Sequence, residues 1–126
     1  MSKTLLVVDD SMIIREMIKD IATDNGWTVV GEGSNGQEAI DRFAELRPSA
    51  VTLDLIMPYH DGLYALKGIR EIDDNANVLV VSALEQKSVL REALELGASD
   101  FIVKPFVPER LSNALEKLHL AAAAST

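Results

Sequence analysis

Five polar residues stand at or just after the ends of short apolar runs. Three are carboxylates, one is a hydroxyl and one is an ammonium: Asp9, Asp10, Asp54, Ser82 and Lys104. A carboxylate can act as a covalent nucleophile. A hydroxyl and an ammonium can stabilise the charge on the equatorial oxygens of a phosphoryl group. Brought together, these residue types would suit the transfer of a phosphoryl group to an aspartate.

The charge of this set predicts a divalent cation. Three carboxylates and one ammonium leave a net charge of −2, and like charges held a few ångströms apart cost several kcal/mol. All the donors are oxygens, and neither Cys nor His stands at these positions. Such donors favour a hard ion, Mg²⁺ with Mn²⁺ as a substitute, over Zn²⁺. Taken singly, each residue is more often a cap, a turn former or a solvated charge, so the hypothesis depends on their joint position.

The elements that must position these residues follow one alternating pattern. Short apolar runs predict strands, and apolar residues at helical spacing predict helices between them. The strands are expected at residues 5–8, 28–30, 50–53, 78–81 and 101–103. The helical stripes lie within residues 14–22, 39–44, 63–69, 89–94 and 111–118. Strands that are apolar at successive positions imply a parallel sheet covered on both faces.

The pattern therefore predicts an α/β fold, a doubly wound five-stranded parallel sheet of (βα)5 type. The expected strand order is the flavodoxin-like 2-1-3-4-5, in which ligands bind where the order reverses, outside the carboxyl ends of the strands. That reversal lies between the first and third strands, which end at Asp9–Asp10 and at Asp54. Topology should thus gather residues that are far apart in the sequence.

Length and composition predict one domain, residues 1–126, whose residues 121–126 prolong the last helix or fray. The chain has 126 residues, 48% of them hydrophobic and 25% charged, as in ordinary globular domains. It has no cysteine for a disulfide or thiolate site, and its net charge of −8 argues against nucleic acid or an anionic membrane as a partner. The first apolar run is too short for a signal peptide or a membrane span, so we expect a cytoplasmic protein. We also expect the protein to be a monomer.

Five segments, in this order and spacing, resemble the response-regulator receiver domains of two-component signalling, of the single-domain chemotaxis (CheY-like) type. They are residues 5–11 (LLVVDDS), 54–58 (DLIMP), 61–62 (DG), 81–83 (VSA) and 101–106 (FIVKPF). The resemblance covers nearly the whole chain. It implies a phospho-acceptor signalling switch rather than an enzyme, with slow loss of its own phosphoryl group.

The resemblance also implies the acceptor and the metal ligands. Asp54 would receive a phosphoryl group from a phosphohistidine. Asp10 would bind Mg²⁺ directly and Asp9 through water. Asp54 and the backbone carbonyl of Ile56 would supply further metal ligands.

The remaining roles concern the later strands. Ser82 and Lys104 would contact oxygens of the phosphoryl group. Phe101 stands where the family has a switch aromatic that becomes buried when the acceptor is phosphorylated. The bond before Pro105 is expected to be cis, which proline permits. Leu84 corresponds to a position that tunes phosphorylation and hydrolysis rates.

The implied partners are proteins. The donor would be a sensor histidine kinase or a phosphotransfer protein, and the reader a downstream protein such as a flagellar motor switch. Chemotaxis is the leading interpretation. A stand-alone phosphorelay intermediate, or a receiver that is a fragment of a larger regulator, stays open.

Two rival functions have partial sequence support. Residues 31–36 fit the G-x-G-x-x-G fingerprint of dinucleotide-binding domains, but they follow the second expected strand, and the chain has too few strands for two full halves of that fold. An aspartyl phosphatase would need an acid two residues after its nucleophile, where this chain has Ile56. Both readings are therefore disfavoured.

Overall fold

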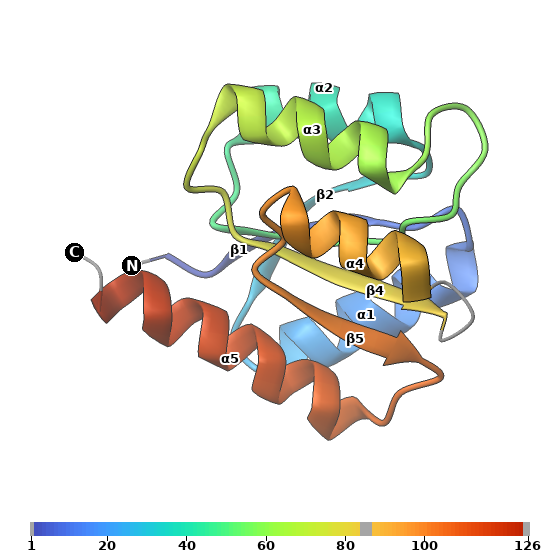
Figure 1. Cartoon of the computed structure of the whole chain (residues 1–126). Coiled ribbons are helices and arrows are strands. Elements are labelled where there is room, and N and C mark those ends of the chain that lie inside the picture. Colours follow the sequence, from blue (N-terminus) through green and yellow to red (C-terminus); the bar gives the residue numbers. More distant parts are fainter. Residues whose placement is uncertain (1, 84–86, 125–126) are drawn as a thin grey trace.

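The computed structural model describes residues 2–83 and 87–124, in which five strands alternate with five helices (Figure 1). The strands are β1 (Thr4–Val8), β2 (Thr28–Gly33), β3 (Ala50–Leu53), β4 (Val78–Ala83) and β5 (Asp100–Lys104). The helices are α1 (Met12–Asp24), α2 (Gly36–Leu46), α3 (Gly62–Ile72), α4 (Lys87–Glu95) and α5 (Pro108–Ala124).

The strands form one parallel sheet in the order β2-β1-β3-β4-β5. The predicted α/β fold and strand order are therefore confirmed. The order reverses between β1 and β3, where Val8 pairs with Leu53. The chain segments that continue into Asp9 and Asp54 consequently leave the sheet side by side.

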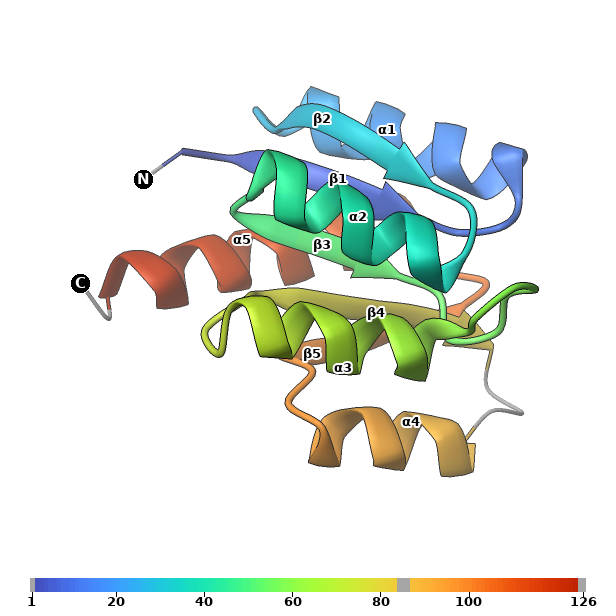
Figure 2. The ribbon, with the colours of Figure 1, turned by 90° about the horizontal axis from the view of Figure 1, so that it is seen from above.

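Helices cover both faces of this sheet (Figure 2). Helices α1 and α5 lie on one face, and α2, α3 and α4 lie on the other. In β1, Leu5 and Val7 belong to the core under α1 and α5, whereas Leu6 and Val8 belong to the opposite core. Because the strand is buried on both faces, its sequence is apolar at successive positions and not only at every second one.

Helices α1, α2 and α3, which follow the loops around the site, each begin at a side-chain cap. Ser11, Asn35 and Asp61 each accept a hydrogen bond from a backbone N–H in the first turn, of α1, α2 and α3 respectively. Such caps satisfy N–H groups that a helix leaves without an internal partner. The caps at Ser11 and Asp61 therefore help to set the path of the loops that follow β1 and β3.

Three strands run further than expected. In β2, Gly31 and Gly33 pair with Leu6 and Val8, so they are strand residues and not part of a phosphate-binding loop. This removes the dinucleotide interpretation. Strands β4 and β5 continue to Ala83 and Lys104, so Ser82 is itself a strand residue, as is Lys104.

Helix α5 continues to Ala124, so residues 121–124 prolong the last helix, one of the two outcomes expected for them. The rest of the expected tail, Ser125 and Thr126, lies outside the described residues, as does Leu84. Across residues 2–83 and 87–124, every helix is too short or too polar to traverse a lipid bilayer.

Candidate functional site

The three aspartates of the expected metal site meet at the carboxyl ends of β1 and β3. Asp9, Asp10 and Asp54 each offer a carboxylate oxygen, and these oxygens lie within 4.8 Å of one another. Asp9 is 1% exposed and Asp54 is 6% exposed, whereas Asp10 is open to solvent. The site therefore has two buried carboxylates at its base and a third at its solvent side.

Asp9 is held on both carboxylate oxygens. Its Oδ1 accepts a hydrogen bond from the Ser11 N–H at 2.9 Å, and the Lys104 ammonium donates to its Oδ2 at 2.7 Å. Its own N–H donates to the Gly33 carbonyl of β2 at 3.0 Å. Both carboxylate oxygens of Asp9 are therefore engaged by donors of the protein.

Asp54 is also contacted on both oxygens, but at longer distances. Ser82 Oγ and the Ile56 N–H each lie 3.3 Å from Oδ1. Lys104 Nζ lies 3.4 Å from Oδ2. The Ser82 hydroxyl and the Lys104 ammonium thus approach different oxygens of the carboxylate, as required of groups that would contact a phosphoryl group placed there.

The charges in the site are only partly balanced. Burial raises the pKa of Asp54 above its usual value, the Lys104 ammonium opposes this, and the charge of Asp9 adds to it. Burial alone would lower the pKa of Lys104, but its hydrogen bond to Asp9 and the charges of Asp54 and Asp9 raise it. Lys104 is therefore held as a cation. The three carboxylates of the site still outnumber it, so an excess of negative charge remains around Asp54.

The donor set fits a hard divalent cation. The ligand atoms that converge are carboxylate oxygens from Asp9, Asp10 and Asp54, and Ile56 is placed beside them by the bond from its N–H to Asp54. Mg²⁺ accepts one or two carboxylates, with water and phosphate oxygens at its other positions. The solvent-facing side at Asp10 is compatible with both.

The expected switch residue lies on β5, the edge strand that also carries Lys104. Phe101 is partly buried, packs against the core under α2, α3 and α4, and lines a groove of about 560 Å³ between α4 and β5. The Lys104–Pro105 bond is cis, as the resemblance implies.

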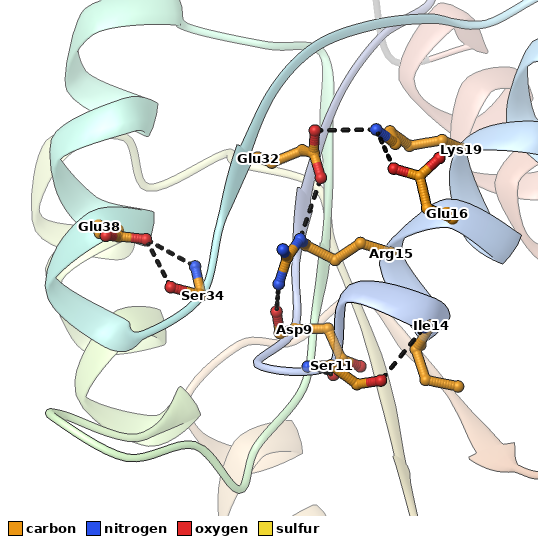
Figure 3. Close-up of polar contacts among 9 residues, drawn as sticks. All are labelled: Asp9, Ser11, Ile14, Arg15, Glu16, Lys19, Glu32, Ser34 and Glu38. Atoms are coloured by element: carbon orange, nitrogen blue, oxygen red, sulfur yellow. Dashed lines mark hydrogen bonds and ion pairs between the residues drawn. The ribbon is translucent and has the colours of Figure 1, made fainter.

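Two contacts near the site were not predicted from the sequence. Arg15 donates to the backbone carbonyl of Asp9 at 2.7 Å (Figure 3). Gly62, at the start of α3, packs so closely on the backbone of Asp54 and Leu55 that a side chain there would collide with it. The Asp61-Gly62 pair is one of the segments that carry the resemblance, whereas nothing in the sequence spacing distinguishes Arg15 from a solvated arginine.

Comparisons with known proteins agree with this geometry. A family model for the response regulator receiver domain matches residues 5–116. The chemotaxis protein CheY of Thermotoga maritima is 48% identical over 118 residues, which cover 94% of this chain and 98% of the relative. The receiver domain of AraT, a response regulator from Geobacillus stearothermophilus, superimposes with a TM-score of 0.91 at 31% identity and covers 99% of this chain and 98% of its own.

A similar chain also occurs in the CheX–CheY–BeF3–Mg²⁺ complex from Borrelia burgdorferi. Its TM-score is 0.87 at 31% identity, with 92% of this chain and 88% of that chain covered. Receiver domains are switches of two-component signalling. Because the family match spans most of the sequence, and the relatives include chemotaxis proteins of nearly the same length, the chain belongs to the response regulator receiver domain family, of the chemotaxis type.

Proposed function

We propose that Asp54 accepts a phosphoryl group from a phosphohistidine of a sensor kinase or phosphotransfer protein. Asp9, Asp10, Asp54 and the backbone carbonyl of Ile56 would hold Mg²⁺, with Mn²⁺ as a possible substitute. The phosphorylated chain would then present an altered surface to a downstream protein in chemotaxis.

The observation that carries this proposal is the environment of the Asp54 carboxylate. Asp54 is 6% exposed, yet Ser82 and Lys104 approach its two oxygens separately, at 3.3 and 3.4 Å. A buried carboxylate that served only structure would be expected to form short, saturating hydrogen bonds. The longer contacts here leave its oxygens available as a nucleophile.

The chemistry is a displacement at phosphorus. An oxygen of Asp54 forms a bond to the phosphorus, and the bond between phosphorus and the histidine nitrogen breaks. The imidazole leaves as a neutral group when its other ring nitrogen carries a proton. The product is an acyl phosphate on Asp54, and no general base is needed because an ionised carboxylate carries no proton that must be removed before it attacks.

The surrounding residues then act on the new group. Lys104 and Ser82 would each contact one of its oxygens, and bound Mg²⁺ would supply the positive charge that the excess of carboxylates lacks. The phosphoryl group can shift a conformational equilibrium only through contacts that differ between the two states. Movement of Ser82 toward the phosphoryl group, with Phe101 moving into the vacated space, would provide that difference and change the surface of α4, β5 and α5.

The test is phosphoryl transfer to a matched pair of variants. With a phosphorylated kinase and Mg²⁺, we expect wild type and Asp61→Asn to take up label, and Asp54→Asn to take up none. Asp61 is a suitable control because it is an exposed aspartate on the following loop, and Asn can replace it as a helix cap. Equal, Mg²⁺-dependent labelling of Asp54→Asn would show that the acceptor lies elsewhere. Loss of label on standing would measure the slow self-dephosphorylation that we propose.

The downstream target is proposed from the relatives. Because the similar proteins include chemotaxis CheY proteins, we propose a cytoplasmic monomer whose reader is a protein such as a flagellar motor switch. Binding would be measured to a motor-switch peptide and to a phosphotransfer domain, each with and without BeF₃⁻ and Mg²⁺. If binding to the motor-switch peptide requires BeF₃⁻, the chemotaxis target is supported. If the chain binds only the phosphotransfer domain, a phosphorelay intermediate is favoured.

A further inference from the structure

Arg15 joins the site loop to a network of charged residues on α1 and β2 (Figure 3). Its guanidinium donates through one nitrogen to the Asp9 carbonyl at 2.7 Å and through Nε to Glu32 Oε1 at 3.0 Å. Glu32 Oε2 accepts from Lys19 at 2.9 Å, and Lys19 lies 2.8 Å from Glu16. Arg15 is thus held at both ends, by the backbone that follows β1 and by a carboxylate of β2.

The bond from Arg15 completes the hydrogen bonding of Asp9. The Asp9 N–H donates to Gly33, and its two carboxylate oxygens accept from Ser11 and Lys104. That leaves the backbone carbonyl, which is the group that Arg15 binds. This carbonyl belongs to the peptide that links Asp9 to Asp10. The orientation of that peptide governs the direction in which the Asp10 carboxylate leaves the chain.

The charge of Arg15 is balanced away from the site. A lone guanidinium beside three carboxylates would compete with a metal cation for them. Here Glu32 occupies the second donor, and Lys19, the largest influence, lowers the pKa of Glu32 together with Arg15, despite an opposing effect of burial. Glu32 therefore remains a carboxylate that keeps Arg15 directed at a carbonyl.

We propose that Arg15 is a positioning residue for the divalent cation: it fixes the Asp9–Asp10 peptide, and Glu32 fixes Arg15. This inference rests on the proposed function, since it concerns the affinity of that metal site. In this role Arg15 would act through the Asp9 carbonyl, without touching the metal or the phosphoryl group. Its effect is to hold one ligand-bearing peptide in the orientation that binding requires, as outer groups do in other metal sites.

The alternative, that Arg15 is only a surface ion pair, makes the opposite prediction for metal affinity. Removing a positive charge near a cation site should strengthen cation binding by a small factor, on the order of twofold at physiological ionic strength. Loss of positioning should weaken it. The sign of the change therefore separates the two roles, and neither sign depends on phosphorylation.

The experiment compares Arg15→Met with Lys19→Met. Both remove one positive charge from α1 and keep an aliphatic stem, but only Arg15 contacts Asp9. Mg²⁺ affinity would be measured by calorimetry and Mn²⁺ affinity by electron paramagnetic resonance, without a phosphodonor. We expect Arg15→Met to bind roughly tenfold more weakly than wild type. Lys19→Met should bind as tightly as wild type or slightly more tightly.

Two further measurements keep the result independent of folding. Urea unfolding without metal establishes that each variant is folded under the binding conditions. Amide hydrogen exchange at Asp10 and Ser11 should become faster in Arg15→Met and not in Lys19→Met.

A second pair of variants tests the anchor of Arg15. Glu32→Gln leaves Arg15 in place but loosens its second anchor, so it should weaken Mg²⁺ binding more than Glu16→Gln. The Glu16 variant loses an equal charge one step further along the network.

Each outcome decides between the ideas. If folded Arg15→Met binds Mg²⁺ as tightly as wild type or more tightly, Arg15 is not a positioning residue, and the proposed function stands. If wild type itself binds neither Mg²⁺ nor Mn²⁺, the metal site of the proposed function fails and this inference fails with it. Weaker binding in Arg15→Met with normal binding in Lys19→Met supports both.

Discussion

Lys104 Nζ lies 2.7 Å from Asp9 Oδ2 but 3.4 Å from Asp54 Oδ2. The ammonium is therefore bound more closely to the carboxylate of β1 than to the expected phosphoryl acceptor. Asp9 is 1% exposed and depends on Lys104 for much of its charge compensation. A divalent cation bound by the same carboxylates would share that task, so Lys104 and the cation would compete for Asp9.

This competition predicts the behaviour of Lys104→Met. Without metal, the variant should lose about 2 kcal/mol of unfolding free energy, because removing one partner of a partly buried pair leaves charge uncompensated. With saturating Mg²⁺ the deficit should shrink, and by linkage the variant should bind Mg²⁺ more tightly than wild type. Phosphorylation of Asp54 should nevertheless fall, because a contact to the phosphoryl group is lost.

Urea unfolding in EDTA and in excess Mg²⁺, with calorimetry for the affinity, checks this prediction. Lys117→Met is the control, since Lys117 is an exposed lysine on α5 and its removal should change neither quantity. A deficit in Lys104→Met that is the same with and without Mg²⁺ would show that the ammonium and the cation do not act on the same carboxylates.

A second prediction concerns acid stability at the start of α2. The Ser34 N–H donates to Glu38 Oε1 at 2.8 Å and the Ser34 hydroxyl at 2.9 Å. The backbone bond from Ser34, and then its hydroxyl, lower the pKa of Glu38 below the usual value. A carboxyl with a lowered pKa in the folded state stabilises the protein at pH above the usual glutamate pKa, and this contribution is lost as pH falls through the lowered value.

Glu38→Gln should therefore be less stable than wild type at neutral pH, and the difference should disappear as the pH falls through that range. Unfolding free energies of both proteins, measured by urea titration between neutral and strongly acidic pH, give the comparison. Glu45→Gln, which alters a residue with an exposed side chain on the same helix, provides the control. A gap between wild type and Glu38→Gln that stays constant with pH would argue against ionisation of Glu38 as its cause.

The sequence was sufficient to predict which residues would meet at the site edge. Asp9, Asp54 and Lys104 end or follow different strands, and parallel pairing brings the same ends of those strands together. Once alternating apolar runs predict a parallel sheet, the gathering of these residues follows from topology alone. The fold and the members of the site were therefore predictable without knowledge of any side-chain conformation.

What the sequence did not predict depends on pairing and on side-chain reach. Gly31 and Gly33 are poor strand formers by themselves, yet they extend β2 because Leu6 and Val8 of β1 offer backbone partners. Arg15 is one arginine on an amphipathic helix, and its two bonds depend on how α1 packs against the ends of β1 and β2. Neither arrangement leaves a local pattern in the sequence.

A third prediction comes from a buried hydroxyl. Thr52 lies in the middle of β3 and is fully buried, and its Oγ1 is, among the described residues, the one buried side-chain oxygen or nitrogen without a hydrogen-bond partner. A buried polar group without a partner destabilises the folded state, and replacement by an apolar group of the same shape removes that cost. Thr52→Val should therefore raise the unfolding free energy by about 1 kcal/mol.

Thermal and urea unfolding test this change. The matched control is Thr28→Val, which makes the same substitution at an exposed position of edge strand β2 and should have an effect within about 0.5 kcal/mol of zero. Because Thr52 lies two residues before Asp54, which directly follows β3, Mg²⁺ affinity should be measured as well, and it should not change. A loss of stability in Thr52→Val would mean that the hydroxyl has a partner in solution.

The last prediction concerns the close packing of α3 against the segment that carries Asp54. A Cβ at Gly62 would lie 2.5 Å from the Leu55 Cα and would collide with the Asp54 carbonyl. These are backbone atoms, which cannot move without displacing the segment that carries the acceptor. At Gly68 of the same helix, a Cβ would meet the side chain of Ile40 instead, which can change rotamer.

Gly62→Ala should therefore cost about 3 kcal/mol and Gly68→Ala about 1 kcal/mol or less, since overpacking is tolerated best where a side chain can yield. Urea unfolding of the two variants gives this ratio. Because the Gly62 N–H also donates to the Leu55 carbonyl at 2.9 Å, a displaced α3 should move Asp54, so folded Gly62→Ala should bind Mg²⁺ more weakly while Gly68→Ala should not. Equal costs in stability with equal Mg²⁺ affinity would show that the backbone after β3 adjusts freely, and that the close packing of α3 does not hold Asp54 in place.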